Sequence, residues 1–252
     1  MTAIPPPAGT VRLPTLPAPM DSIWLTILDL AQRIPPDRWT LIGGQMVVLH
    51  GLANGRQPVR ITRDVDVLAA LLVTRSGIRD CVHAVSDMGF TPQEATDHTI
   101  LHRFVRDPDR AVVDIVAPDH SPPTWPLTTI PPRKTIRVEG GTQALERTVV
   151  YEVIQDGDRS LVPTPSVLGS LILKAAAYLA DSRDRDRHAY DAAFLAGLIE
   201  DPRAARATFK GSDRKRLLAL DRIIGKRDHP AWRALGDAAE DSYLSWRLLT
   251  AH

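Results

Sequence analysis

Three aspartates are the residues of this sequence whose types and spacing point most directly to chemistry. Asp64 and Asp66 alternate with apolar residues in the run Asp64–Leu68, which has the two-residue period of a strand, so both carboxylates are expected on one face. Asp114 lies in a second apolar run, Ala111–Val116. Carboxylates on neighbouring strands are what two hard divalent cations need to clamp triphosphate oxygens. We therefore predict that these three aspartates hold Mg²⁺ or Mn²⁺.

A pair of glycines precedes the aspartates and suits a phosphate. Gly43 and Gly44 stand between a short apolar strand, Trp39–Ile42, and a helix, Gln45–His50. Residues without a Cβ let the backbone approach a phosphate closely, and the following helix offers its N-terminal N–H groups. We expect Gly43, Gly44 and Gln45 to cradle the β- and γ-phosphates of a nucleoside triphosphate.

The order of these motifs resembles the DNA polymerase beta superfamily of nucleotidyltransferases, and more narrowly the AbiEii/MenT group of toxin nucleotidyltransferases. The motif residues that carry the resemblance are Gly43, Gly44, His50, Gly51, Arg60, Thr62, Asp64 and Asp66. Lys174 and Asp191 look like the lysine and the late aspartate of that group. The resemblance covers about Leu41 to Leu198. The sequence departs from the group's pattern in the late run, where His188 stands in place of an acid, and between Asp114 and Pro165, where no motif matches. These departures leave the substrate open.

The resemblance implies transfer of a nucleotide from a nucleoside triphosphate to an acceptor hydroxyl, with release of pyrophosphate. It implies a toxin of a toxin-antitoxin system that acts on the tRNA 3′ end, with tRNA and a cognate antitoxin as partners. Lys174 would neutralise triphosphate charge and Asp191 would position that lysine or the nucleotide. Arg60 and Thr62 are assigned to nucleotide binding on the same grounds.

Several of these residues also have a plain structural interpretation. Asp191 is spaced to pair with Arg187 one helical turn earlier, and Lys174 is able to extend out of an amphipathic helix into solvent. Two interpretations of Arg60 remain open: a solvated charge in a loop, or a role in substrate binding or in a structural ion pair. We interpret His50 as a packed histidine at a helix end and exclude it from the catalytic set.

Two other functions remain open. A small-molecule adenylyltransferase of the antibiotic-modifying kind would share the metal site but would need a compact acidic acceptor pocket. A catalytically silent nucleotidyltransferase fold would act as a regulatory module, which the intact aspartates argue against. From residue 166 to the end, 15 Lys/Arg face 12 Asp/Glu, and this small positive surplus favours RNA.

The pattern of the whole chain predicts an α+β fold, with a polymerase-beta-like mixed sheet, flanking helices and a helical C-terminal domain. We expect a flexible proline-rich arm over 1–20, an α/β domain over 21–162 and the helical domain over 163–252. Besides the helix after the diglycine, one helix is expected to begin near Asp21. The others are expected over Ile78–Met88, Ser166–Leu179, Arg187–Ile199, Arg214–Ile224 and Ala239–Leu249. The further expected strands are Thr99–Val105, Thr135–Val138 and Thr148–Ile154, with a Gly140-Gly141 turn between the last two.

The bulk composition excludes several classes of protein. The 252 residues contain one cysteine, Cys81, and no charged-then-apolar leader opens the sequence, so we expect a cytoplasmic protein without disulfides. The longest apolar runs are too short for a membrane helix. Motifs for a serine nucleophile, a Walker-type phosphate loop or a zinc site are not present.

Overall fold

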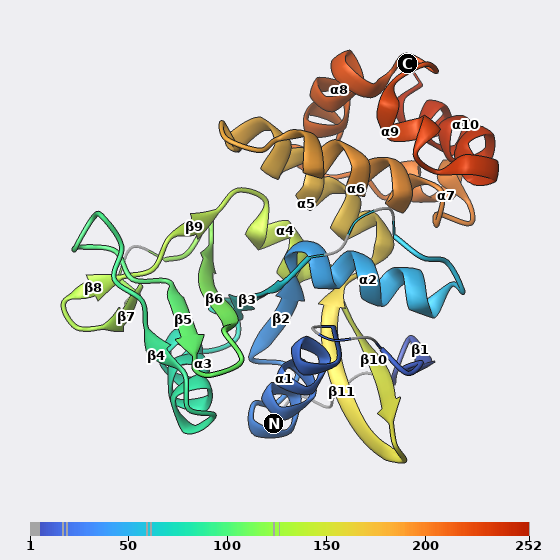
Figure 1. Cartoon of the computed structure of the whole chain (residues 1–252). Coiled ribbons are helices and arrows are strands. Elements are labelled where there is room, and N and C mark those ends of the chain that lie inside the picture. Colours follow the sequence, from blue (N-terminus) through green and yellow to red (C-terminus); the bar gives the residue numbers. More distant parts are fainter. Residues whose placement is uncertain are drawn as a thin grey trace.

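The computed structural model describes residues 6–16, 18, 20–58, 60, 62–122, 124–125 and 127–251. Its central feature is a mixed sheet in the order β2-β3-β6-β5-β4, with β9 pairing to β6 beyond that path (Figure 1). These strands are β2 (Trp39–Ile42), β3 (Asp64–Ala69), β4 (Thr91–Pro92), β5 (Arg103–Arg106), β6 (Ala111–Pro118) and β9 (Arg137–Val138). β3 runs parallel to β6, whereas β2 and β5 are antiparallel to these neighbours. The expected α+β class with a mixed sheet is confirmed.

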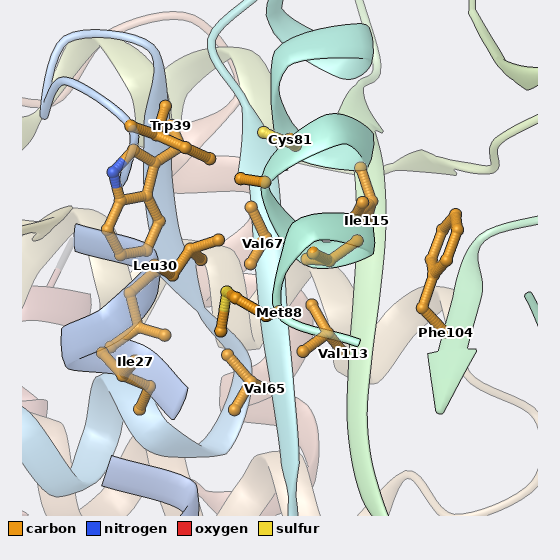
Figure 2. Packing of buried hydrophobic residues seen from close by; sticks show 14 of the residues in the cluster. Ile27, Leu30, Trp39, Val65, Val67, Cys81, Met88, Phe104, Val113 and Ile115 are labelled. Atoms are coloured by element: carbon orange, nitrogen blue, oxygen red, sulfur yellow. The ribbon is translucent and has the colours of Figure 1, made fainter. Parts of the chain in front are cut away.

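Alternation along β3 and β6 divides the sheet into an apolar face and a face that carries the aspartates. Val65 and Val67 on β3, together with Val113 and Ile115 on β6, point into the first hydrophobic core. Figure 2 shows this face covered by α1 (Met20–Arg33) and α3 (Gly77–Asp87). The space is filled by Ile27 and Leu30 of α1, Cys81 of α3 and Met88, which directly follows α3. Because side chains alternate across a strand, the aspartates at 64, 66 and 114 face the opposite way.

The opposite face packs against the helical part of the chain. Leu68 and Val116 join a second core, to which α2 (Gly43–Ala53) and the C-terminal helices contribute. These helices are α5 (Val167–Ala180), α6 (Asp186–Ala196), α7 (Pro202–Ala207), α8 (Asp213–Ile224), α9 (Pro230–Arg233) and α10 (Ala239–Thr250). In Figure 1 they stand above α2 and the sheet. The aspartate face is therefore roofed by α5 and α6, which brings residues more than a hundred positions apart together.

The N-terminal segment corrects one prediction. We expected a flexible arm over 1–20, but Gly9–Arg12 forms β1, which pairs in parallel with β10 (Thr148–Gln155). β10 continues into β11 (Asp158–Pro165) as a long hairpin, completing a three-stranded sheet. Val11 is 2% exposed because it packs into the first core, which adds to the pairing with β10. Residues 1–5, 17 and 19 of the expected arm lie outside the described residues.

Most expected elements are present, but the eight-residue strand β11 was not predicted, and the other differences concern short elements. The Gly140-Gly141 turn begins a short helix, α4 (Gly141–Glu146). Of the expected strand Thr135–Val138, only the second half forms a strand, β9, and a separate short strand, β8 (Arg133–Lys134), ends just before Thr135. β8 pairs with β7 (Thr128–Ile130) in a separate ribbon. Among the described residues, no helix combines the length and apolar character needed to cross a membrane.

Candidate active site

The three predicted aspartates lie together at one cavity. Asp66 and Asp114 are direct register partners in the parallel pair β3–β6, and Asp64 is two residues before Asp66 on the same face. All three line a cavity of about 210 Å³ between the sheet and α5. The carboxylates therefore form one wall of a single site, as their spacing predicted.

Burial and mutual repulsion shape the electrostatics of this wall. The pKa of Asp66 is raised from 3.8 to about 6, chiefly because its carboxyl is removed from water and also because the charges of Asp114 and Asp64 lie nearby. Lys174 acts in the opposite direction. The cluster thus concentrates negative charge that a cation would relieve.

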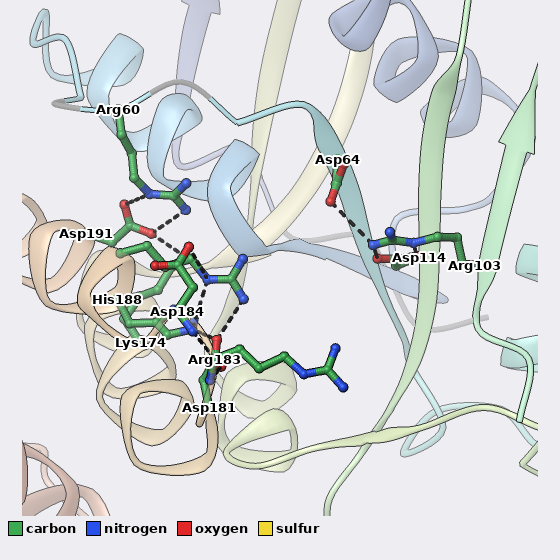
Figure 3. Close-up of polar contacts among 11 residues, drawn as sticks. Arg60, Asp64, Arg103, Asp114, Lys174, Asp181, Arg183, Asp184, His188 and Asp191 are labelled. Carbon is green, nitrogen blue, oxygen red and sulfur yellow. Dashed lines mark hydrogen bonds and ion pairs between the residues drawn. The ribbon is translucent and has the colours of Figure 1, made fainter. Parts of the chain in front are cut away.

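Arg103 is a functional-site residue that the sequence analysis missed. Its Nε donates to Asp114 Oδ1 at 2.8 Å, and a second guanidinium nitrogen donates to Asp114 Oδ2 at 2.6 Å and to Asp64 Oδ2 at 3.4 Å (Figure 3). The hairpin register contained a usable signal. Arg106 pairs with Ala111 across the turn, so three residues back along β5 and three residues forward along β6 place Arg103 opposite Asp114.

The diglycine is packed against the aspartates and the loop before them. A Cβ built on Gly43, whose φ is +72°, would lie 1.8 Å from Asp66 Oδ2, and one on Gly44 would lie 2.5 Å from the Thr62 side chain. Only glycine therefore fits either position with the present arrangement. Gly43, Gly44 and Thr62 line the cavity, and α2 starts at Gly43 without a side-chain cap.

Gln45 is placed differently from the other members of the predicted phosphate cradle. Its side chain is fully buried, and its Nε2 donates to the backbone oxygen of Thr62 at 3.0 Å. Gln45 is not among the cavity-lining residues. The side chain thus supports the loop that carries Thr62, while a phosphate contact through the Gln45 backbone stays a prediction.

Lys174 and Asp191 form a buried ion pair at the opposite wall. Lys174 Nζ lies 2.6 Å from Asp191 Oδ2, and the two side chains are 4% and 2% exposed. Arg60 Nε and a second guanidinium nitrogen donate to the two Asp191 oxygens at 2.9 and 3.0 Å. Burial alone would raise the pKa of Asp191, but Lys174 and Arg60 together hold it below its ordinary value.

This arrangement excludes the plain structural interpretation of Asp191 and Lys174. Asp191 joins α5 to the loop before β3 through Lys174 and Arg60, instead of pairing with Arg187 on its own helix. Arg187 contacts Asp181 at 2.9 Å. Lys174 and Arg60 both line the cavity, so Asp191 holds two cations at its edge (Figure 3).

Of the arginines at positions 183, 185 and 187, only Arg187 lines the cavity. Arg187 and His188 line it, and His188 Nε2 lies 3.2 Å from Asp181 Oδ2. Arg183 is exposed and does not line the cavity, and the Arg185 guanidinium lies 5.6 Å from the Tyr178 ring centroid.

His50 is a packed histidine, as predicted. Its side chain is fully buried, and its Nε2 lies 2.8 Å from the Pro165 backbone oxygen and 3.0 Å from Ser170 Oγ. Burial lowers its pKa to about 4, so the ring is neutral near pH 7. It ties α2 to the start of α5, outside the cavity.

The donor chemistry of the carboxylate wall fits a hard divalent cation, since it offers oxygen ligands of concentrated negative charge. In the part of the chain that the structure describes, no three His, Cys, Asp or Glu side chains converge as a preformed metal site. Asp114 and Asp64 face the guanidinium of Arg103 instead, which stands in as a cation. The residues fit a metal ion, but the cluster is arranged around Arg103.

The mixed sheet presents paired aspartates to a cavity that α5 and α6 close, as expected above for a nucleotidyltransferase. The chain belongs to the family described as "Nucleotidyl transferase AbiEii toxin, Type IV TA system", which it matches over residues 28–245. This match includes every predicted site residue. The AbiEii part of the predicted resemblance is thus confirmed, and the protein is a transferase of a toxin family.

Two further comparisons add context. A solved structure, that of an antigenic nucleotidyltransferase-like protein from Paracoccidioides brasiliensis, is similar with a TM-score of 0.49 and 15% sequence identity. The similarity covers 88% of this chain and 93% of that chain. No curated protein matches the sequence.

Proposed function

We propose that this protein transfers a nucleotide from a nucleoside triphosphate to the 3′ end of tRNA, with release of pyrophosphate, as a cytoplasmic toxin controlled by an antitoxin. The observation that carries the proposal is the division of one cavity into two walls. Asp64, Asp66 and Asp114 form the anionic wall, and Arg60 and Lys174 form the cationic one. A triphosphate with divalent cations needs both.

The anionic wall is the place for Mg²⁺ or Mn²⁺, with Asp64, Asp66 and Asp114 as the residues that would hold it. A divalent cation there would supply charge neutralisation for the triphosphate and its transition state. The pKa of Asp66, raised by burial and by its neighbours, supports this assignment because a cation would relieve the same repulsion.

The cationic wall and the start of α2 serve the triphosphate. Lys174 and Arg60 are held by Asp191 with their charged ends at the cavity, so they offer preorganised partners for phosphate oxygens. Gly43 and Gly44 place the uncapped first turn of α2 beside the same cavity. Backbone N–H groups at such a helix start bind phosphates.

The acceptor hydroxyl attacks the α-phosphorus, a new phosphoester bond forms, and the bond to pyrophosphate breaks. Asp114 is the carboxylate assigned to the attacking side, where it would receive the hydroxyl proton. Arg103 forms an ion pair with Asp114 at 2.6 Å. Positive charge at that position favours an anionic acceptor such as RNA and opposes a polycationic aminoglycoside, so we prefer the RNA reaction to small-molecule adenylylation.

The experiment is incubation of the purified protein with Mg²⁺, total tRNA and each of the four nucleoside triphosphates labelled at the α-phosphate. An Asp64→Asn variant is the control, and an aminoglycoside replaces tRNA in a parallel set. We expect label in tRNA with the unmodified protein alone. Label in the aminoglycoside, or none in any acceptor, would overturn the tRNA proposal.

A further inference from the structure

Arg103 occupies the oxygens that a metal ion would need. Its guanidinium takes both oxygens of Asp114, at 2.8 and 2.6 Å, and reaches Asp64 at 3.4 Å. Asp114 is 8% exposed on its side chain, so water competes little for this contact. A bidentate contact between a guanidinium and a carboxylate is among the stronger hydrogen-bonded ion pairs.

The backbone fixes this contact. Arg103 and Asp114 are direct cross-strand partners in the antiparallel pair β5–β6, and Asp114 is in turn the partner of Asp66 in the parallel pair β3–β6. Side chains opposite each other on neighbouring strands share one face of the sheet. The arginine and the aspartates therefore meet over the same small area of the site.

A divalent cation and the guanidinium are unable to share these oxygens without repulsion. A metal ion on Asp114 would lie beside the positive charge of Arg103 and compete for the same lone pairs. The Arg103 side chain is 39% exposed, so the guanidinium has solvent into which it can move. Asp114 also accepts two hydrogen bonds from Arg103, so the same oxygens are covered against an approaching metal ion or hydroxyl.

We propose that Arg103 is a positioning residue whose guanidinium holds the carboxylate cluster together without metal, and which a divalent cation displaces from Asp114 when the metal site forms. This inference rests on the metal site of the proposed function. When no metal is bound, the positive charge of Arg103 thereby offsets the repulsion within the carboxylate cluster. Its departure frees Asp114 for the attacking hydroxyl. The displaced Arg103 guanidinium stays near the acceptor side of the site, where an RNA phosphate would attract it.

The test measures binding of Mn²⁺ alone, without triphosphate or RNA. Binding is detected as the loss of the electron paramagnetic resonance signal of free Mn²⁺. We expect Arg103→Gln to bind Mn²⁺ about tenfold more tightly than the unmodified protein, equivalent to about 1.4 kcal/mol. Arg106→Gln is the matched control, since Arg106 lies on the same strand and pairs with Asp109 at 2.7 Å, away from the cluster. It should leave Mn²⁺ affinity unchanged.

Two more variants complete the experiment. Asp66→Asn should lose Mn²⁺ binding, which locates the ion at the cluster. Arg103→Lys keeps the charge without the bidentate contact, and we expect an intermediate affinity; it carries the test if Arg103→Gln does not fold. Equal or weaker Mn²⁺ binding in the Arg103 variants, or undiminished binding in Asp66→Asn, would overturn the inference. Because no nucleotide is transferred in this assay, failure of the tRNA reaction would leave its result intact.

Discussion

Asp66 on β3 lies directly opposite Asp114 on β6, so two carboxylates face the same cavity from neighbouring parallel strands. This register places like charges side by side in a partly buried position, which costs stability in the absence of a cation. The cost is visible in the pKa of Asp66, which is raised to about 6. Such an arrangement is expected where charge is held for function.

Asp66→Asn should therefore change activity and stability in opposite directions. Removal of the buried charge relieves the repulsion, so the melting temperature without metal should rise at pH 7.5. Nucleotide transfer should fall by roughly 10³-fold, because metal-ion stabilisation of the transition state is worth several kcal/mol. Differential scanning fluorimetry and a transfer assay measure the two effects; a less stable but active variant would contradict the prediction.

Asp191→Ala should be strongly destabilising, because it leaves the buried Lys174 charge without its partner. We expect a loss of about 3–5 kcal/mol in the free energy of unfolding, measured by urea denaturation. Asp184→Ala is the control, since Asp184 is 68% exposed on its side chain and should cost less than about 0.5 kcal/mol. The double variant Lys174→Met/Asp191→Asn should regain stability without activity. Full activity in that double variant would rule out a role for Lys174.

Gly43→Ala tests the close approach of the diglycine to the carboxylates. The new Cβ would collide with Asp66, so transfer should fall by about 10²-fold or more as the carboxylate shifts. Gly55→Ala is the matched control, because Gly55 also has a positive φ, +63°, but nothing lies within 4 Å of a Cβ there. Both changes carry a backbone cost of about 1–2 kcal/mol. Equal activity in the two variants would mean that the Gly43 contact has no catalytic importance.

His50 predicts a specific pH dependence of stability. Its folded pKa of about 4 lies below the unfolded value of 6.5, so the unfolded state binds more protons and stability is lost as the pH falls from 6.5 to 4. The contribution is ~3 kcal/mol across that window. His50→Gln should flatten the unfolding free energy in this range relative to the unmodified protein, since all other titrating groups are common to both. An unchanged slope would show that His50 titrates normally.

Much of the carboxylate wall could be predicted because its signal is local. Asp64 and Asp66 alternate with valines in one strand, so periodicity places both on one face, and Asp114 lies in another apolar run. The pairing of Asp114 with Asp66 follows from the β3–β6 register. Arg103 has no comparable local signal: an arginine at a strand start is ordinary, and its role depends on the hairpin register that places it opposite Asp114.

Contacts between distant parts of the chain could not be predicted from the periodicity of the sequence. Asp191 has Arg187 at helical spacing, yet it pairs with Arg60 because α6 packs over the loop before β3. The strand at Gly9–Arg12 was hidden by prolines, since its stability comes from pairing with β10, which is more than a hundred residues away. Long-range pairing, not local propensity, decided both cases.

Nucleotidyl transfer is tested most directly by tracing the α-phosphate and the γ-phosphate of the triphosphate separately. The protein is incubated with tRNA, Mg²⁺ and the preferred nucleoside triphosphate, labelled at either the α- or the γ-phosphate. We predict that α-label enters tRNA in equal amount to the pyrophosphate released, that γ-label appears only in pyrophosphate, and that Asp66→Asn does neither. Transfer of γ-label to the acceptor, or undiminished α-label transfer by Asp66→Asn, would contradict nucleotidyl transfer by this aspartate cluster.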